Sequence, residues 1–197
     1  MREHRVAVWC GLDAWRAEYV DIWLHADRLL ARGTQLGVEP EPYRLHHALD
    51  TAPRFTTARL TADTAGAGWS RRLDLARDPD GSWHMSADQA GSTDLPNPGG
   101  EPAAIAGAID CDVAFSALFN SLPALRENLL HGGQPRDFEM AFVSVPDLAV
   151  SRSRQRYEPL DDQRVQFISL DSDYRAEIRF DADGLVTLYE DFLERVA

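Results

Sequence analysis

Apolar and polar residues alternate along much of this chain, in short runs separated by Gly, Pro, Asp and Asn. Successive side chains of a β-strand point to opposite faces, so a spacing of two is typical of strands that bury one face. The residues between the runs favour the tight turns of antiparallel hairpins. The alternation therefore predicts a mainly β, antiparallel fold. The predicted strands cover residues 6–9, 18–25, 43–50, 55–60, 69–76, 109–115, 138–145, 164–169, 174–180 and 186–189.

The run at residues 18–25 has large apolar side chains on both of its faces. Val20 and Ile22 would point one way, and Tyr19 and Trp23 the other. Because both faces are apolar, we expect this strand to lie between the core and either a cavity or a second layer.

Turn and loop signals fall between the predicted strands. Asp-Gly pairs at residues 80–81 and 183–184 predict tight turns, because Gly takes a positive φ without steric strain. Residues 90–106 are rich in Gly and Pro and predict a long surface loop or lid. Neither side of this loop has enough strands to close a sheet alone. Residues 1–197 are therefore expected to form a single domain.

One or two short helices are expected among the strands. Residues 123–130 follow Ser121, which could act as an N-cap, and Gly132 stands just past their end. Residues 190–196 are predicted to form a helix at the end of the chain.

The charge of the chain argues against several kinds of partner. Asp and Glu number 32 against 20 basic residues, all of them arginine, so the formal net charge is -12. Such a field repels nucleic acid and anionic lipid surfaces, and we expect neither as a partner. Lysine is absent, which excludes a Schiff-base lysine, a pyridoxal-phosphate lysine and a phosphate-loop lysine.

The sequence also bears on the expected compartment. Arg5, Asp13 and Arg16 interrupt the first residues and leave no apolar core for a signal peptide. No apolar run approaches the roughly 18 residues of a membrane-spanning helix. Cys10 and Cys111 lie far apart and are interpreted as small buried side chains. We therefore expect a cytoplasmic protein with reduced thiols and no membrane span.

Familiar catalytic and metal-binding motifs are missing from the sequence. It contains no GxSxG, HExxH, GxGxxG after a strand, or GxxxxGK[ST]. His46 and His47 are adjacent, but neighbouring residues of a strand point to opposite faces, so only one could enter a common site. We accordingly expect no metal ion and no cofactor.

The densest group of polar residues lies between residues 107 and 126. On a strand, Asp110 and Asp112 would project to one face. If that face is enclosed, the two carboxylates could share a proton or divide acid and base roles; if it is open, they are solvated surface charges. Arg126 is the expected counter-ion of one of them, either as a structural clamp or as a ligand clamp.

Gln155 and Tyr157 would share one face of another strand. An amide beside an aromatic ring is a usual way to hold a sugar or another polyol, and it is equally common as an inter-strand packing pair. The sequence leaves both interpretations open.

A set of motifs, taken in order, resembles the putative glycolipid-binding family, which consists of bacterial proteins of about this size. The resemblance runs from Trp9 to Phe192, and its most specific part is the G-x-x-D-x-D block followed by N-[ST]-L-P. It implies a spiral β-roll, or incomplete barrel, like that of lipoprotein-localisation carriers. The motifs are GTQLG (33–37), YRLHHALD (43–50), FTTARL (55–60), DGSW (80–83), GAIDCDVAF (107–115), FNSLPALR (119–126), QRY (155–157) and DGLVTLY (183–189).

The chain departs from the family pattern at three places. Residues 116–119 read Ser-Ala-Leu-Phe where the family has Thr-Pro-x-Thr, and Leu125 replaces the first of two arginines after the proline. The loop at residues 90–106 is also longer than is usual.

The resemblance implies a binding or carrier protein for an amphiphilic small molecule such as a glycolipid. Trp9, Trp23, Tyr43, Trp69 and Phe167 are the candidates for an apolar lining. The candidates for head-group contacts are Asp110, Asp112, Asn120, Arg126, Gln155 and Tyr157. Each buried methylene contributes roughly 0.8 kcal/mol, so the chain of the ligand would set the strength of binding and these polar groups its selectivity.

Two alternatives remain open. The same cavity could serve a cofactor-independent enzyme, a cyclase, isomerase or dehydratase of small-molecule biosynthesis. Asp110 or Asp112 would then be the acid or base, and Tyr157 or Arg126 would stabilise negative charge. An exposed sheet edge could also pair two copies of the chain as a homodimer.

Overall fold

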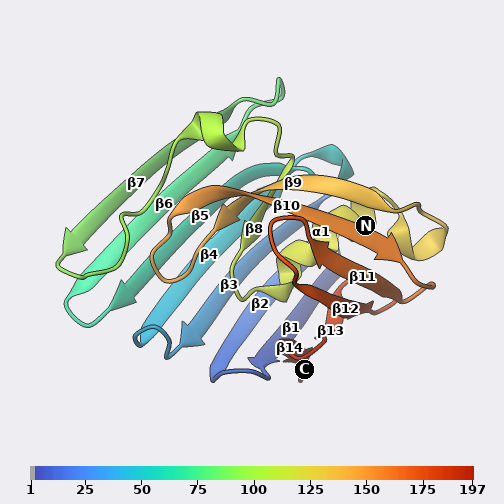
Figure 1. Cartoon of the computed structure of the whole chain (residues 1–197), viewed down its shortest axis with the longest axis horizontal. Coiled ribbons are helices and arrows are strands. Elements are labelled where there is room, and N and C mark those ends of the chain that lie inside the picture. Colours follow the sequence, from blue (N-terminus) through green and yellow to red (C-terminus); the bar gives the residue numbers. More distant parts are fainter. Residues whose placement is uncertain (1–2) are drawn as a thin grey trace.

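The computed structural model describes residues 3–197, and every strand in that range belongs to one large sheet (Figure 1). The fold is mainly β, as the alternation predicts. The strands of the first half are β1 Glu3–Gly11, β2 Arg16–Leu24, β3 Leu29–Gly37, β4 Tyr43–Thr51, β5 Thr57–Gly66, β6 Trp69–Arg77 and β7 Trp83–Gly91. Those of the second half are β8 Asp110–Val113, β9 Arg136–Val143, β10 Val150–Pro159, β11 Arg164–Ser169, β12 Arg175–Phe180, β13 Val186–Tyr189 and β14 Leu193–Arg195.

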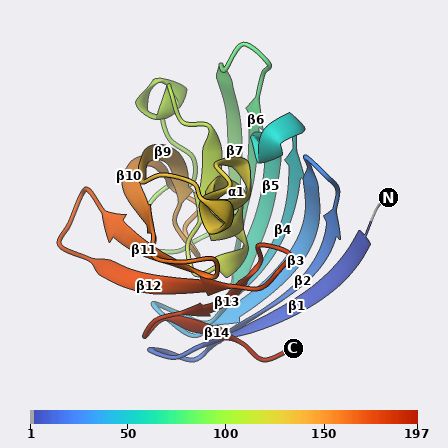
Figure 2. The same cartoon turned by 90° about the vertical axis from the view of Figure 1, so that its right-hand side faces the viewer.

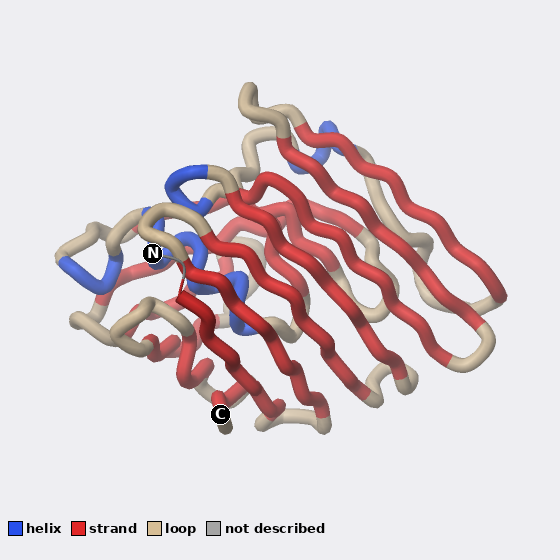
Figure 3. Tube along the Cα trace, turned by 180° about the vertical axis from the view of Figure 1, so that it is seen from behind, coloured by secondary structure: helices blue, strands red, loops and turns tan. Residues whose placement is uncertain are grey.

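The strand order follows from two meanders that meet in the middle of the sheet. It reads β7-β6-β5-β4-β3-β2-β1-β14-β13-β12-β11-β10-β9-β8. Chain neighbours pair antiparallel, and β1 joins the two halves by pairing with β14, where Gly11 lies opposite Leu193. Among the strands of residues 3–197, β8 and β9 alone pair in parallel, at one edge of the sheet. The first half presents a broad outer face in Figure 3.

The sheet curls around a short helix and does not close into a barrel. Figure 2 shows α1 (Ser121–Arg126) inside the curl, with β3–β5 on one side and β9–β10 on the other. The edge strand β8 is tied to β5 within the curl, because the amide of Cys111 donates a hydrogen bond to Oγ1 of Thr57 at 3.0 Å. This is an open spiral roll, the architecture that the family resemblance implies.

Short 3-10 helices precede and follow α1 in the chain and also occur in two of the connections between strands. They are η1 Pro53–Phe55, η2 Pro102–Ile105, η3 Ala117–Asn120 and η4 Leu129–His131. The predicted helix at residues 123–130 is therefore two pieces, α1 and η4, and Ser121 is the first residue of α1 while Asn120 occupies the N-cap position. No helix in residues 3–197 is both long enough and apolar enough to cross a lipid bilayer.

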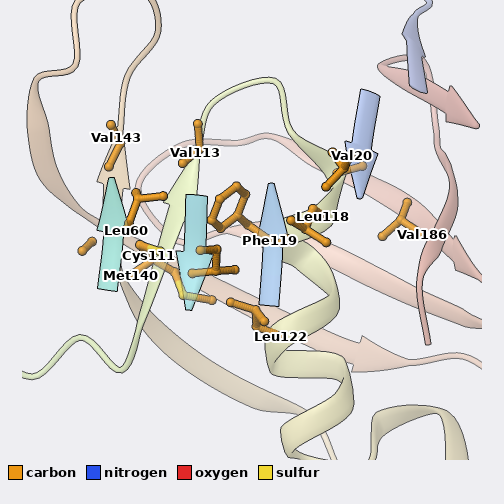
Figure 4. Packing of buried hydrophobic residues seen from close by; sticks show 14 of the residues in the cluster. Val20, Leu60, Cys111, Val113, Leu118, Phe119, Leu122, Met140, Val143 and Val186 are labelled. Atoms are coloured by element: carbon orange, nitrogen blue, oxygen red, sulfur yellow. The ribbon is translucent and has the colours of Figure 1, made fainter. Parts of the chain in front are cut away.

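The core fills the inside of the curl (Figure 4). Phe119 and Leu122 come from the helical segment, and Leu60 and Val143 face them from strands of the two halves. All four side chains are almost completely buried. The helical segment thus supplies the apolar filling that an open, strongly curved sheet requires.

The predicted faces of two strands can be compared with the structure. On β4, His47 is buried with its apolar neighbours and His46 is exposed, as the period of two predicts. On β2, Val20 and Ile22 are buried. The expectation that the other face of β2 also lies against a cavity or layer is wrong at Tyr19, which is 45% exposed on the outer face.

The predicted helix at residues 190–196 is wrong. Asp191 has a φ of 57°, which ends the turn after β13, and β14 then pairs with both β13 and β1. Leu193 is buried at this junction. Pairing on both sides of the strand overrides the local helical preference, because it satisfies the backbone of a segment that fills the middle of the sheet.

The two Asp-Gly turns are confirmed, with φ of 95° at Gly81 and 75° at Gly184. The loop predicted at residues 90–106 is shorter in the structure, because β7 continues to Gly91 and η2 occupies the far end. Arg71 holds the middle of the loop by donating hydrogen bonds to the carbonyl oxygens of Leu95 and Pro96, and it also bonds that of Asp147.

Candidate functional site

A pocket with a cavity volume of about 570 Å³ opens beside β8–β11 and β13. Its walls are aromatic rings, small apolar side chains and polar groups, which come from the second half of the chain except for Asp13. The lining residues are Asp13, Asp112, Val113, Ala114, Phe115, Ser116, Asn120, Phe142, Ser144, Val145, Ser153, Gln155, Phe167, Ser169, Ser172, Tyr174, Tyr189 and Phe192. Pockets of this size and mixture are typical of small-molecule sites.

Five aromatic rings form a continuous wall of the pocket. Phe167 packs against Tyr174 and Tyr189, with ring centroids 6.0 and 5.7 Å away. Tyr189 meets Phe192 at 5.2 Å, and Phe192 meets Phe115 at 6.0 Å. Rings at these separations and tilts pack favourably against one another, so the wall is preformed and apolar.

Arg16 covers the outer side of this wall. Its guanidinium carbon lies 4.3 Å from the ring centre of Phe115 and 5.1 Å from that of Phe192. Nη1 and Nη2 of Arg16 donate to the two carboxylate oxygens of Asp13, at 2.5 and 3.2 Å. Asp13 thus compensates the charge of this arginine.

Asp112 lies at the polar end of the pocket. Its Oδ2 accepts a hydrogen bond of 2.7 Å from Nε2 of Gln155, which also donates to Oγ of Ser153 at 3.3 Å. Burial raises the pKa of Asp112 to about 6, the bond from Gln155 opposes this rise, and the charge of Asp110 adds to it. Loss of hydration disfavours the charged form, which is why the pKa of this carboxyl lies above its usual range.

Asn120 links the pocket to a buried tyrosine. Its Nδ2 donates a hydrogen bond of 2.8 Å to Oη of Tyr157, and Tyr157 in turn donates to Oε1 of Gln155 at 3.4 Å. Tyr157 is fully buried and stacks edge-on against Phe138 and Phe167. Gln155 and Tyr157 therefore share a strand face as predicted, with the amide lining the pocket and the ring behind it.

Behind the pocket wall at Ser116 lies a buried polar network, which the sequence did not predict. Oγ of Ser116 donates to Oε2 of Glu18 at 2.8 Å, and Oε1 of Glu18 lies 2.7 Å from Nε2 of His47. All three residues are at most 4% exposed. Gly33 lies opposite His47 across the strand pair, and a Cβ there would overlap the imidazole ring.

The alternation of apolar and polar residues along β2 and β4 contained a signal for this network. Glu18 shares the face of Val20 and Ile22, and His47 shares the face of Leu45 and Leu49, so two polar groups stand on apolar faces. A buried charge requires a partner, and such positions therefore predict one.

Asp110 and Arg126 form a pair that does not line the pocket. Nη1 of Arg126 bonds Oδ1 and Oδ2 of Asp110 at 2.7 and 2.6 Å, and the two side chains are 3% and 0% exposed. Burial raises the pKa of Asp110, and the charge of Arg126 opposes this rise. The contact joins α1 to β8, as the structural interpretation of Arg126 expects.

The predicted site residues thus divide into two groups. Asp112, Asn120, Gln155 and Phe167 line the pocket. The others lie outside its lining: Trp9, Trp23, Tyr43, Trp69, Asp110, Arg126 and Tyr157.

The four candidates for an apolar lining that lie outside the pocket have other contacts. Nε1 of Trp9 donates to the carbonyl oxygen of Val186 at 3.0 Å in the core. Trp23 stacks on His4 with ring centroids 5.2 Å apart. Tyr43 donates to Oε1 of Gln35 at 2.8 Å, and burial raises its pKa to about 12.

The fourth, Trp69, lines a separate hollow beside Pro40, Glu41 and residues 92–95. In the part of the chain that the structure describes, no three His, Cys, Asp or Glu side chains gather in a way that could hold a metal ion.

The pocket offers an aromatic wall together with carboxylates, two amides and several hydroxyls, a combination suited to holding an amphiphile.

Comparison with known proteins adds the following. Residues 6–195 match the model of a family described as "Putative glycolipid-binding". A crystal structure of a DUF1089 family protein from Pseudomonas aeruginosa superposes with a TM-score of 0.73 at 22% sequence identity, covering 91% of this chain and 92% of that one. This likeness confirms the fold. A search of curated proteins finds no match.

Proposed function

This chain belongs to the putative glycolipid-binding family, and from that membership we propose that it binds an amphiphilic small molecule, a glycolipid in the first instance, in the pocket beside β8–β11. The observation that carries the proposal is the pocket itself, with about 570 Å³ between an aromatic wall and the Asp112 end.

The two ends of the pocket suit the two parts of an amphiphile. An alkyl chain packed on the wall formed by Phe115, Phe167, Tyr189 and Phe192 contributes roughly 0.8 kcal/mol for each methylene removed from water. A hydrogen bond to a head group contributes only about 1 kcal/mol net. The apolar wall would therefore supply most of the affinity, and the polar end would choose among head groups.

The first experiment asks what the protein carries. Purified protein would be extracted with organic solvent and the extract analysed by mass spectrometry, and the emptied protein would be titrated with the uncharged fluorescent probe N-phenyl-1-naphthylamine. We expect an amphiphile in the extract and saturable binding of the probe at one site per chain.

A matched pair of variants locates the binding. Ser169→Trp fills the pocket, whereas Ser86→Trp adds the same ring on β7, at an exposed position outside the pocket. We expect the first variant to lose probe binding and the second to keep it. Equal binding by both variants would place the probe elsewhere and contradict the proposal.

A second function, a cofactor-independent enzyme, draws support from Asp112. A carboxyl whose pKa is raised to about 6 inside a pocket can give and take a proton near neutral pH. Tyr157 and Arg126 do not line the pocket, so this function would depend on Asp112 with Asn120. The Asp112→Asn variant should then bind the extracted compound and fail to convert it; conversion at the native rate excludes this role.

A further inference from the structure

The charges around the pocket are not balanced. Of the lining residues, Asp13 and Asp112 are acidic, and none is Arg or His. Asp13 is paired with Arg16, so that arginine brings no net positive charge to the aromatic wall. The neighbouring Arg126 is likewise occupied, by Asp110 and Glu127. The carboxylate of Asp112 is held by an amide rather than a cation, which leaves the polar end negative.

Several hydrogen-bond donors at this end are used within the protein. Both amide hydrogens of Gln155 go to Asp112 and Ser153, and the hydroxyl hydrogen of Ser116 goes to Glu18. Asn120 donates one of its two amide hydrogens to the hydroxyl oxygen of Tyr157. Acceptor oxygens remain on Asp112, Ser116 and Asn120, and the hydroxyls of the other serines that line the pocket can both donate and accept.

The polar end of the pocket therefore distinguishes head groups by their charge and by whether they donate hydrogen bonds. A phosphate, sulfate or carboxylate has acceptors only, and it would meet a carboxylate with no cation to offset it. A sugar hydroxyl or an ammonium group donates hydrogen bonds and can satisfy these acceptors directly.

Building on the proposed function, we propose that the pocket selects amphiphiles whose head group donates hydrogen bonds and has no negative charge, and that Asp112 is the residue that sets this preference. The head-group class comprises sugar hydroxyls and ammonium groups. Ser116 supports it as a second acceptor, because Glu18 and His47 behind the pocket wall fix the direction of its hydroxyl hydrogen.

The test compares four amphiphiles with the same ten-carbon chain. Decyl glucoside, decylammonium, decyltrimethylammonium and decyl sulfate would each compete with N-phenyl-1-naphthylamine at pH 8, below their micelle concentrations. Trimethylammonium has a positive charge without donors, so it separates charge from hydrogen bonding. We expect the glucoside and the ammonium to compete at concentrations at least about tenfold lower than the sulfate, with trimethylammonium between them.

Two variants assign the preference to Asp112. Asp112→Asn keeps the shape and removes the charge, and it should bring sulfate to within about threefold of the glucoside. Asp162→Asn removes one charge from an exposed turn between β10 and β11 and should leave the native order unchanged. Circular dichroism would establish that both variants are folded, and the comparison on the native protein stands without them.

The outcomes separate this preference from the proposed function. Equal competition by all four amphiphiles, or an unchanged order in Asp112→Asn, overturns the preference and leaves an amphiphile-binding pocket. Competition by none of the four overturns the proposed function, and the preference with it.

Discussion

Arg126 is bound to Asp110 through a single guanidinium nitrogen, with Nη1 lying 2.7 and 2.6 Å from the two carboxylate oxygens in a site closed to solvent. The pair connects the helix inside the curl to the edge strand β8 that carries Asp112 into the pocket.

Removal of Arg126 should destabilise the fold strongly. Arg126→Met leaves the carboxylate of Asp110 buried without its ion-pair partner, which typically costs about 3–5 kcal/mol of unfolding free energy. Urea unfolding followed by circular dichroism measures the loss. The double variant Arg126→Met/Asp110→Leu removes both charges and should be more stable than the single variant. A loss below about 1 kcal/mol in Arg126→Met would contradict the structural role of the pair.

Asp112 should make the stability of the protein depend on pH. Burial raises its pKa from 3.8 to about 6, so between these values the folded state holds a proton that the unfolded chain releases. The free energy of unfolding should therefore fall as the pH rises from about 4 to about 6 and then level off. At about 1.4 kcal/mol per pKa unit, the contribution is on the order of 2–3 kcal/mol.

Urea titrations at a series of pH values, with native protein and Asp112→Asn, isolate this contribution. The difference between the two proteins should grow through that window, with the asparagine variant the more stable at pH 7.5. Asp162→Asn, which changes an exposed carboxyl, should follow the native curve. Parallel curves for the native protein and Asp112→Asn would show that Asp112 titrates normally.

Gly33 should tolerate no side chain while His47 is present. A Cβ at Gly33 would overlap the imidazole ring, which Glu18 and Phe119 hold in place. Gly33→Ala should therefore cost about 1–3 kcal/mol through overpacking. In a double-mutant cycle, the same substitution made in His47→Ala should cost less, because the space is free. Additive costs would mean that the ring and Gly33 do not share this space.

Arg71 should hold the long loop against the sheet. Its guanidinium donates to the carbonyl oxygens of Leu95, Pro96 and Asp147. Arg71→Met should leave these carbonyls without a partner, lower the stability by about 1–3 kcal/mol and speed amide hydrogen exchange in residues 92–101.

The neighbouring Arg72 provides the matched control for this prediction. Its side chain is 69% exposed and pairs with Asp63 on the other face of the strand. Arg72→Met should change stability by less than about 1 kcal/mol and leave the exchange of the loop as it is. Equal effects of the two substitutions would argue against the clamp at Arg71.

The strands missed by the sequence analysis show where alternation fails as a guide. β3 contains Gly33, Thr34 and Gln35, so its buried face is not apolar in sequence. Gln35 is nevertheless fully buried, because Tyr43 and the carbonyl oxygens of Ala114 and Phe115 satisfy its amide. Such partners come from distant parts of the chain and cannot be inferred from a local pattern.

The candidate site could be predicted only in part, because some of its contacts also come from distant parts of the chain. Spacing placed Asp112 on one face of β8 and Gln155 on one face of β10, and both side chains line the pocket. Spacing also placed Asp110 on the face of Asp112, but it could not tell that Arg126 would close over one carboxylate and not the other.

The strand-rich class, the two Asp-Gly turns and the inward-pointing residues of β2 and β4 could be predicted from the sequence alone, because period-two alternation and positive φ are local properties of the backbone. The place of the pocket and the predicted residues that line it could be learned only from the folded chain. Those depend on the pairing of β1 with β14 and on the helix inside the curl, which bring together residues as far apart as Asp13 and Phe192. Contacts of that sequence separation are set by how the whole sheet bends and packs, which no single segment encodes.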